Sequence, residues 1–155
     1  MIISKETFKI FDGDEVVDKI LLPINVSNTH WFLVVIDMKG KTISSYDSMG
    51  LQRLDVLSHI KKYLTCKAKA EGVEVTDTWT KSWRCLTATY PRQLNLYDCS
   101  KFVFCCARCV LLDIPISYFD EKKLCERFIF GQEDMPKLRK RFTLEIHKLH
   151  LRNRM

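Results

Sequence analysis

One apolar run constrains the fold of this chain more than any other feature of its sequence. The six residues Trp31–Ile36 are all apolar, end in two valines and an isoleucine, and are followed by Asp37. The run is far shorter than the roughly 20 apolar residues that cross a bilayer, but it suits a strand buried on both faces. We therefore expect no membrane span and a sheet in which this segment is a central strand.

Further strands are predicted on both sides of this one. A short apolar segment at 20–26 predicts one strand, and an extended pattern resumes at 42–46. Turn-forming residues within 38–40 lie between the central run and 42–46, which predicts an antiparallel hairpin with a two-residue turn. One or two more strands are expected over 79–90.

Apolar residues at helical spacing predict three helices. The first follows Ser48, with Asp47 or Ser48 as its N-cap. The second is a largely apolar helix over 99–112, with Asp98 as its N-cap. The last begins near a proline, which is favoured in a first turn. This helix starts near Pro136 and is expected to bury Leu138, Phe142, Ile146 and Leu149.

Composition places the chain among ordinary globular domains. Its 155 residues are 46% hydrophobic and 28% charged, which excludes a disordered tail and a coiled coil, and no linker or repeat divides them. We therefore predict a single domain over 1–155. Lys5 and Glu6 interrupt any secretory signal, so we expect an intracellular location, with the seven cysteines as free thiols. The net charge of +6 favours an acidic partner.

The predicted hairpin brings a histidine and a carboxylate to one face of the sheet. With a two-residue turn, His30 and Asp47 are either directly opposite or diagonal neighbours, whereas a three-residue loop would separate them. A carboxylate beside an imidazole holds its tautomer and stabilises the imidazolium. This is the task of the third member in a set of nucleophile, base and orienting group.

Cys99 is the candidate nucleophile, because it occupies the first turn of the apolar helix, where the helix-end potential favours a thiolate. Six residues upstream, Gln93 lies in a polar loop. Its side-chain amide, together with the backbone N–H of Cys99, can donate hydrogen bonds to an oxyanion. A structural role for this cysteine is the alternative that these observations leave open.

These residues stand in segments that resemble the ubiquitin-like-protein-specific cysteine proteases, the SUMO/sentrin-specific family. The resemblance extends from about Phe8 to Leu149, and order, spacing and flanking residues agree. The matching segments are His30-Trp31, Tyr46-Asp47-Ser48-Met49-Gly50, Gln93-x-Asn95-x-x-Asp98-Cys99, Leu22-Pro23-Ile24-Asn25 and Asp134-Met135-Pro136-x-Leu138-Arg139.

The resemblance implies a papain-like α/β fold with a central, mostly antiparallel sheet packed by helices. It implies His30 as base, Asp47 as orienting residue, Cys99 as nucleophile and Gln93 in the oxyanion hole. Trp31 is expected beside the channel for the Gly-Gly tail of the substrate. No metal and no cofactor are expected.

The implied function is that of a cysteine-type peptidase or isopeptidase. It would remove a ubiquitin-like modifier, SUMO in particular, from lysine side chains or mature its precursor, in the nucleus or cytoplasm. The expected partners are the modifier and its protein conjugates, with no nucleic acid and no membrane.

Two departures from the family pattern, at Ser100 and at the N-terminal side of the chain, support an alternative, a catalytically impaired module that binds the modifier. Ser100 stands where the family usually has glycine. The chain begins after the point where family domains carry further helices, so it is expected to be the C-terminal portion of the catalytic domain. An insertion of unassigned role spans Tyr118–Ile129.

Two other motifs were weighed as functional sites. Cys106-x-x-Cys109 lies within an apolar helix without a second matching pair, so we interpret it as core rather than zinc ligands. The bases in 137–141 have no interleaved aromatic residues or groove motif, so we interpret them as a solvated helix face rather than a nucleic-acid site.

Overall fold

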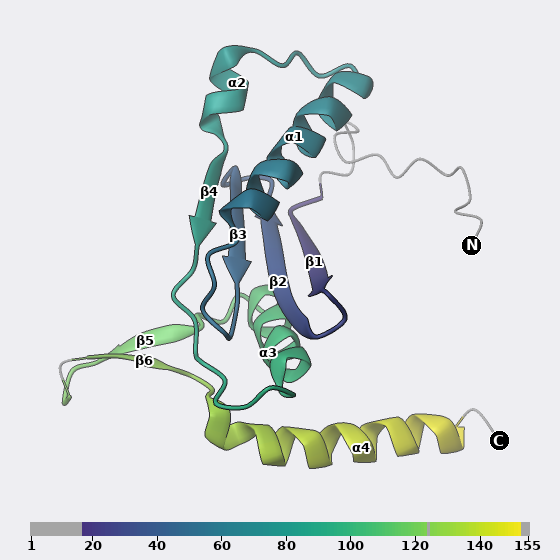
Figure 1. Ribbon diagram of the computed structural model, residues 1–155, viewed down its shortest axis with the longest axis vertical. Coiled ribbons are helices and arrows are strands. Elements are labelled where there is room, and N and C mark those ends of the chain that lie inside the picture. Colours follow the sequence, from purple (N-terminus) through teal and green to yellow (C-terminus); the bar gives the residue numbers. More distant parts are fainter. Residues whose placement is uncertain (1–16, 124, 153–155) are drawn as a thin grey trace. The chain divides into compact units, whose positions relative to one another are not determined.

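The computed structural model describes residues 17–123 and 125–152 (Figure 1). Four strands form the main sheet in the order β1-β2-β3-β4. They are β1 (Lys19–Val26), β2 (His30–Asp37), β3 (Thr42–Tyr46) and β4 (Arg84–Thr87). Short connections join β1 to β2 and β2 to β3, which makes both pairs antiparallel, while β3 and β4 are parallel. The expected α/β architecture with a mostly antiparallel central sheet is confirmed.

The apolar run occupies the centre of this sheet, as predicted. Residues 32–36 of β2 are all buried, and β2 has a strand on each side, as a central strand buried on both faces does. The turn after β2 differs from the prediction, since four residues, 38–41, separate β2 from β3. The side chain of Asp37 accepts a hydrogen bond from the backbone N–H of Gly40 at 2.7 Å and so stabilises the longer turn.

The segment 79–90 contains one strand, β4, and not two. Trp79, which was predicted to be extended, lies in the short helix α2 (Asp77–Ser82). The reason is local, since the hydroxyl of Thr76 caps this helix by accepting a hydrogen bond from the Trp79 N–H at 3.1 Å.

Helix α1 (Leu54–Ala70) starts later than predicted, and neither of its predicted caps is used. Its N-cap position is Arg53, without a side-chain capping bond. Asp47 and Ser48 instead make hydrogen bonds to other parts of the chain, which are described with the candidate site.

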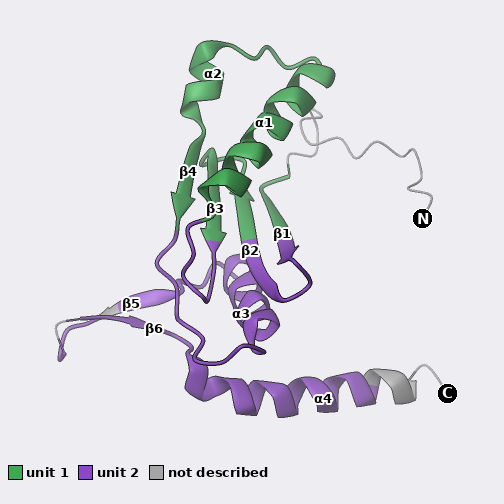
Figure 2. Ribbon diagram, in the orientation of Figure 1, with its two compact units in different colours: residues 1–22, 34–45, 53–87 green, residues 23–33, 46–52, 88–155 purple. Residues whose placement is uncertain are grey.

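The chain divides into two compact units that are interleaved in the sequence (Figure 2). The described part of unit 1 comprises 17–22, 34–45 and 53–87, and that of unit 2 comprises 23–33, 46–52, 88–123 and 125–152. The single catalytic domain over 1–155 stays a prediction.

Unit 1 contains α1, which contacts β4. Lys61 of α1 donates a hydrogen bond through Nζ to the carbonyl of Trp83, at 2.8 Å, just before β4 begins. The buried apolar side chains of this unit come from its strand segments, from α1 and from Trp83; they are Val34, Val35, Ile36, Ile43, Leu57, Leu64, Ala68 and Trp83.

Unit 2 contains α3 (Cys99–Leu111), the 3-10 helix η1 (Gln132–Asp134) and α4 (Met135–Arg152). An aromatic cluster forms part of its core. The ring of Tyr90 meets those of Tyr46, Phe102 and Phe130 edge-on, at centroid distances of 5.7, 6.2 and 5.8 Å. The Tyr90 hydroxyl also donates to the carbonyl of Phe102, so the cluster ties the segment before the candidate site to α3.

Helix α4 follows its prediction only in part. Leu138 and Phe142 are half-buried, and Phe142 packs edge-on against Phe104 at a centroid distance of 4.5 Å. Ile146, predicted to be buried, is exposed, because no described element covers that face of the helix. The side chain of Leu149 lies outside the described residues. No helix in the described ranges is both long and apolar enough to span a membrane.

The insertion noted in the sequence forms a small antiparallel sheet of its own. Strands β5 (Ser117–Asp120) and β6 (Cys125–Phe128) pair with Ser117 opposite Phe128. The side chains of Ser117 and Glu126 are hydrogen bonded across this pair.

Candidate active site

His30 and Asp47 are brought together by neighbouring strands of the sheet. His30 is the first residue of β2, and Asp47 directly follows β3. His30 Nε2 lies 2.8 Å from Asp47 Oδ1, and both residues are buried. The predicted proximity of the two side chains is therefore confirmed, since the four-residue connection, like the two-residue turn, has an even number of residues.

The backbone after Asp47 holds the carboxylate in place. Asp47 Oδ1 accepts a second hydrogen bond from the backbone N–H of Met49, at 2.8 Å, and the Asp47 carbonyl accepts from the N–H of Gly50, also at 2.8 Å. Gly50 has φ +72°, a conformation that costs other residues more than glycine. This turn orients the carboxylate independently of the histidine.

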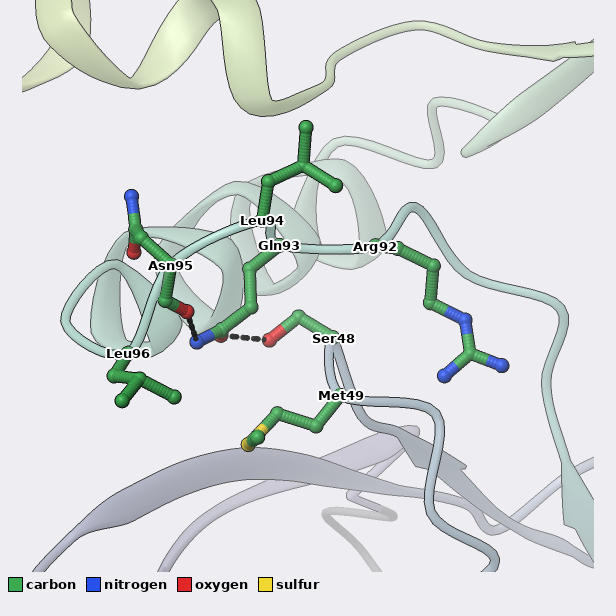
Figure 3. A pocket seen from close by; sticks show the side chains of 7 residues that line it. All are labelled: Ser48, Met49, Arg92, Gln93, Leu94, Asn95 and Leu96. Carbon is green, nitrogen blue, oxygen red and sulfur yellow. Dashed lines mark hydrogen bonds between the residues drawn. The ribbon is translucent and has the colours of Figure 1, made fainter.

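Gln93 is bound to the same turn by two hydrogen bonds, of which Figure 3 shows the one between the side chains of Ser48 and Gln93. The backbone N–H of Gln93 donates to the carbonyl of Ser48 at 2.9 Å, and the Ser48 hydroxyl donates to Gln93 Oε1 at 2.6 Å. Gln93 Nε2 donates to the carbonyl of Asn95 at 2.5 Å. The amide is thus fixed with its oxygen toward Ser48. A primary amide carries two N–H donors, and one of them is used by Asn95.

Asp98, the residue before Cys99, is a buried carboxylate with several donors. Oδ2 accepts from Asn95 Nδ2 at 2.7 Å and from Gln132 Nε2 at 2.9 Å, while Oδ1 accepts from Arg139 Nη2 at 2.6 Å. Burial by itself raises the pKa of this carboxyl. The hydrogen bonds from its three donors outweigh that effect and lower the pKa to about 2.

This arrangement corrects the predicted role of Asp98. The residue occupies the N-cap position of α3, but its side chain makes no capping hydrogen bond. Its oxygens bind donors from the preceding loop, from η1 and from α4 instead. The physical reason is charge, because a hydrogen bond between a guanidinium and a carboxylate is stronger than a bond to a helix N–H.

Asn95 and Gln132 fix the loop that runs from Gln93 to Cys99. Asn95 Oδ1 accepts from the backbone N–H of Asp98 at 3.0 Å, in addition to the bond that Nδ2 donates to the carboxylate. Gln132 Oε1 accepts from the backbone N–H of Leu94 at 2.8 Å. Each end of the loop is therefore held by a side-chain amide.

Cys99 is the first residue of α3, and it is a buried free thiol. No hydrogen bond between Cys99 and His30 or Gln93 is present among the described residues. The structure therefore joins His30 to Asp47 and Gln93 to Ser48 directly, whereas Cys99 is placed through Asp98. Trp31 follows His30 on β2 and is 40% exposed.

The other cysteines of α3 are core residues. Burial raises the pKa of the Cys105 thiol to about 11 and raises that of Cys106 further still. Neither forms a thiolate at neutral pH. The described residues contain no group of three or more side chains that could hold a metal ion.

Sequence reasoning missed the supporting roles of Ser48, Asn95, Gln132 and Arg139. Their position in the sequence is the signal that could have indicated these roles. All four stand in segments that flank the candidate catalytic residues or contain other family-like positions. Their partners lie up to 45 residues away, so no local pattern identifies them.

Comparison with known proteins shows to which family this chain belongs. The model of the Ulp1 protease family, C-terminal catalytic domain, matches residues 14–154. The chain belongs to the Ulp1 protease family. Mouse and human sentrin-specific protease 5 are each 32% identical to it over 133 residues, which are 85% of this chain and 16% of theirs. Human sentrin-specific protease 3 is 30% identical over 128 residues, 82% of this chain and 20% of its own length.

Solved structures of Ulp1-family domains have the same fold. The C-terminal Ulp1 protease domain in complex with Smt3, the yeast orthologue of SUMO, matches with a TM-score of 0.59 at 27% identity. The match covers 77% of this chain and 47% of that one. The Chaetomium thermophilum Ulp1-like SUMO protease catalytic domain gives a TM-score of 0.61 at 26% identity, over 81% and 44% of the two chains. This chain therefore spans less than half of the solved domains that it matches.

Proposed function

We propose that this chain carries the catalytic residues of a cysteine-type isopeptidase or peptidase that releases a ubiquitin-like modifier of the SUMO type. Two findings support the proposal: membership of the Ulp1 family and the solved Ulp1 domain that holds Smt3. The single observation that carries it is the buried hydrogen bond between His30 and Asp47. The same turn binds Gln93 through Ser48, and the Gln93 loop leads to Cys99.

The His30–Asp47 bond determines which ring nitrogen moves the proton. Because Nε2 faces the carboxylate at 2.8 Å, Nδ1 is the nitrogen that exchanges a proton with the Cys99 thiol. Proton transfer from Sγ to Nδ1 produces a thiolate and an imidazolium. Asp47 stabilises the imidazolium, and its own orientation is fixed by the Met49 N–H.

The thiolate of Cys99 then attacks the carbonyl carbon of the modifier's terminal glycine. A tetrahedral oxyanion forms, which the free N–H of the Gln93 amide and the backbone N–H of Cys99 stabilise. Collapse of this intermediate breaks the C–N bond to the lysine and leaves a thioester on Cys99. The leaving amine takes its proton from Nδ1 of His30.

Water completes the reaction in a second displacement. His30 accepts a proton from the water as it attacks the thioester, and the modifier leaves with a free carboxylate. The same two steps cleave a peptide bond after the terminal glycine of a modifier precursor. Trp31, exposed beside His30 on β2, supplies an apolar surface for the Gly-Gly tail.

The alternative proposal is a module that binds the modifier without hydrolysing its conjugates. Two observations favour it: Ser100 replaces the usual glycine beside the nucleophile, and no hydrogen bond joins Cys99 to His30 within the described ranges. An intracellular site of action, in the nucleus or cytoplasm, accompanies either proposal and is checked by imaging the tagged chain in cells.

A SUMO-type modifier with an electrophilic C-terminus distinguishes the two proposals. The enzyme forms a covalent adduct that Cys99→Ala abolishes and His30→Ala slows, seen as a mass shift on the intact protein. Cys66→Ala is the matched control, because Cys66 is an exposed cysteine of unit 1. Reversible binding of the modifier without any adduct would establish the binding module instead.

A further inference from the structure

A pocket of about 390 Å³ lies against the Gln93 amide (Figure 3). Its walls come from the turn after Asp47, through Ser48 and Met49, and from the loop segment 92–96. The hydrogen bond between Ser48 and Gln93 lies among the side chains that line it. A group that enters this pocket therefore contacts the residue proposed to stabilise the oxyanion.

One part of the pocket is apolar and open to solvent. Leu94 and Leu96 are 83% and 79% exposed, and Met49 is 42% exposed. Figure 3 shows Met49 and Leu96 extending on the same side of the Ser48–Gln93 bond. Leu94 extends on the other side of that bond, so Met49 and Leu96 are the two apolar side chains exposed together on one side of the pocket.

The other part of the pocket carries a positive charge. Arg92 extends beyond Ser48, away from the Met49 and Leu96 side chains, and it is the only charged residue among those that line the pocket. No carboxylate within the described ranges forms an ion pair with it. Its guanidinium lies over Gly50, where a Cβ atom would come within 0.8 Å of Arg92 Nη1. Glycine at this position leaves the space that the guanidinium occupies.

On the proposed function, the modifier and the acceptor protein lie on opposite sides of the scissile bond. On the proposed function, the modifier tail runs beside Trp31, and Trp31 does not line this pocket. The pocket does include Gln93, which contacts the scissile carbonyl. The pocket therefore borders the proposed oxyanion site without bordering the proposed tail channel, and the part of the substrate left to fill it is the acceptor protein that carries the lysine.

We propose that this pocket is a subsite for the acceptor polypeptide around the modified lysine, an inference that rests on the proposed function. The segment that fits it places a large apolar side chain against Met49 and Leu96 and a carboxylate against Arg92. The apolar contact removes exposed hydrophobic surface from water, and the carboxylate pairs with a cation that forms no ion pair with the residues that the structure describes.

Binding to the Cys99→Ala chain tests the subsite without turnover. The probes are two SUMO-type conjugates, joined by an isopeptide bond to a fluorescent lysine peptide. One peptide has a leucine and a glutamate near the lysine, and the other has alanine at both places. Fluorescence anisotropy is expected to show about fivefold tighter binding of the first conjugate, the effect of an exposed ion pair together with a modest apolar contact. Adding Arg92→Glu should remove the ion-pair part of this preference, and replacing the peptide glutamate with lysine should then restore it. Arg84→Glu, an exposed arginine of unit 1, is the matched control.

Turnover separates failure of this inference from failure of the proposed function. The wild-type chain is given the same two conjugates and a third substrate, the modifier joined to a small fluorogenic amine without any peptide. The ratio of kcat/KM between the leucine–glutamate conjugate and the fluorogenic substrate should fall about fivefold in Arg92→Glu. Equal affinity for both conjugates, or an Arg92→Glu effect that is the same on all substrates, overturns the acceptor subsite. Cleavage of none of the substrates, with the binding preference intact, overturns the proposed hydrolysis and leaves the subsite established.

Discussion

Asp98→Asn is the substitution that most directly tests how the loop before Cys99 is held. The carboxylate is 1% exposed and accepts hydrogen bonds from three side chains, which lower its pKa from 3.8 to about 2. At about 1.4 kcal/mol per pKa unit, this depression contributes about 2 kcal/mol to the free energy of unfolding at neutral pH. The asparagine amide removes the charge and turns one acceptor into a donor that faces another donor.

The downward direction of the Asp98 pKa shift determines how its contribution to the free energy of unfolding changes with pH. A depressed pKa stabilises the folded protein above about pH 4, where the carboxyl is ionised in both the folded and the unfolded state. The contribution is lost as the pH falls from about 4 towards 2. The difference in unfolding free energy between wild type and Asp98→Asn should therefore be about 2 kcal/mol larger at pH 7 than at pH 2.

Urea unfolding followed by tryptophan fluorescence, at several pH values between 7 and 2, measures this difference. Asp77→Asn is the matched control, because the Asp77 side chain is 97% exposed and its substitution should change the free energy by less than about 0.5 kcal/mol. A difference between wild type and Asp98→Asn that stays constant over this pH range would refute the reasoning, because it would show that ionised Asp98 is not preferentially stabilised in the folded protein.

Three further predictions concern the site and the exposed surface. Cys105 and Cys106, whose pKa values burial raises, should resist iodoacetamide at pH 8 in the folded protein, as measured by peptide mass spectrometry; alkylation as fast as in urea would contradict their burial. Gln93→Ala should lower kcat roughly 100-fold while the affinity for the modifier is retained; an equal loss of affinity would show that Gln93 has a structural role. Ser48→Ala should lower kcat less, because the hydrogen bond from the Gln93 backbone N–H to the carbonyl of residue 48 remains. The 1–155 chain should self-associate through apolar side chains such as Ile146, so Ile146→Lys should shift light-scattering masses towards the monomer.

Local sequence was sufficient for the elements that are defined by hydrophobicity. The run Trp31–Ile36 predicted the central strand, because a continuous apolar segment of this length suits a strand that is buried on both faces of the sheet. The apolar composition of 99–111 determined α3 in the same way. The neighbourhood of His30 and Asp47 also followed from the sequence, because hairpin geometry depends on a short connection.

Tertiary structure alone decided which partners the polar side chains have. Asp98 looks like a helix cap in the sequence, yet its carboxylate binds Arg139, which is 41 residues away. Ser48 looks like a cap of α1, yet it binds Gln93, 45 residues away. A cap bond is the local option. A charged or amide partner from a distant part of the chain replaces it when folding brings that partner within reach, since hydrogen bonds to charged groups are stronger and unpaired buried groups are costly. The sequence determined where the candidate catalytic residues stand, and the long-range hydrogen bonds decided how the loop that carries them is held.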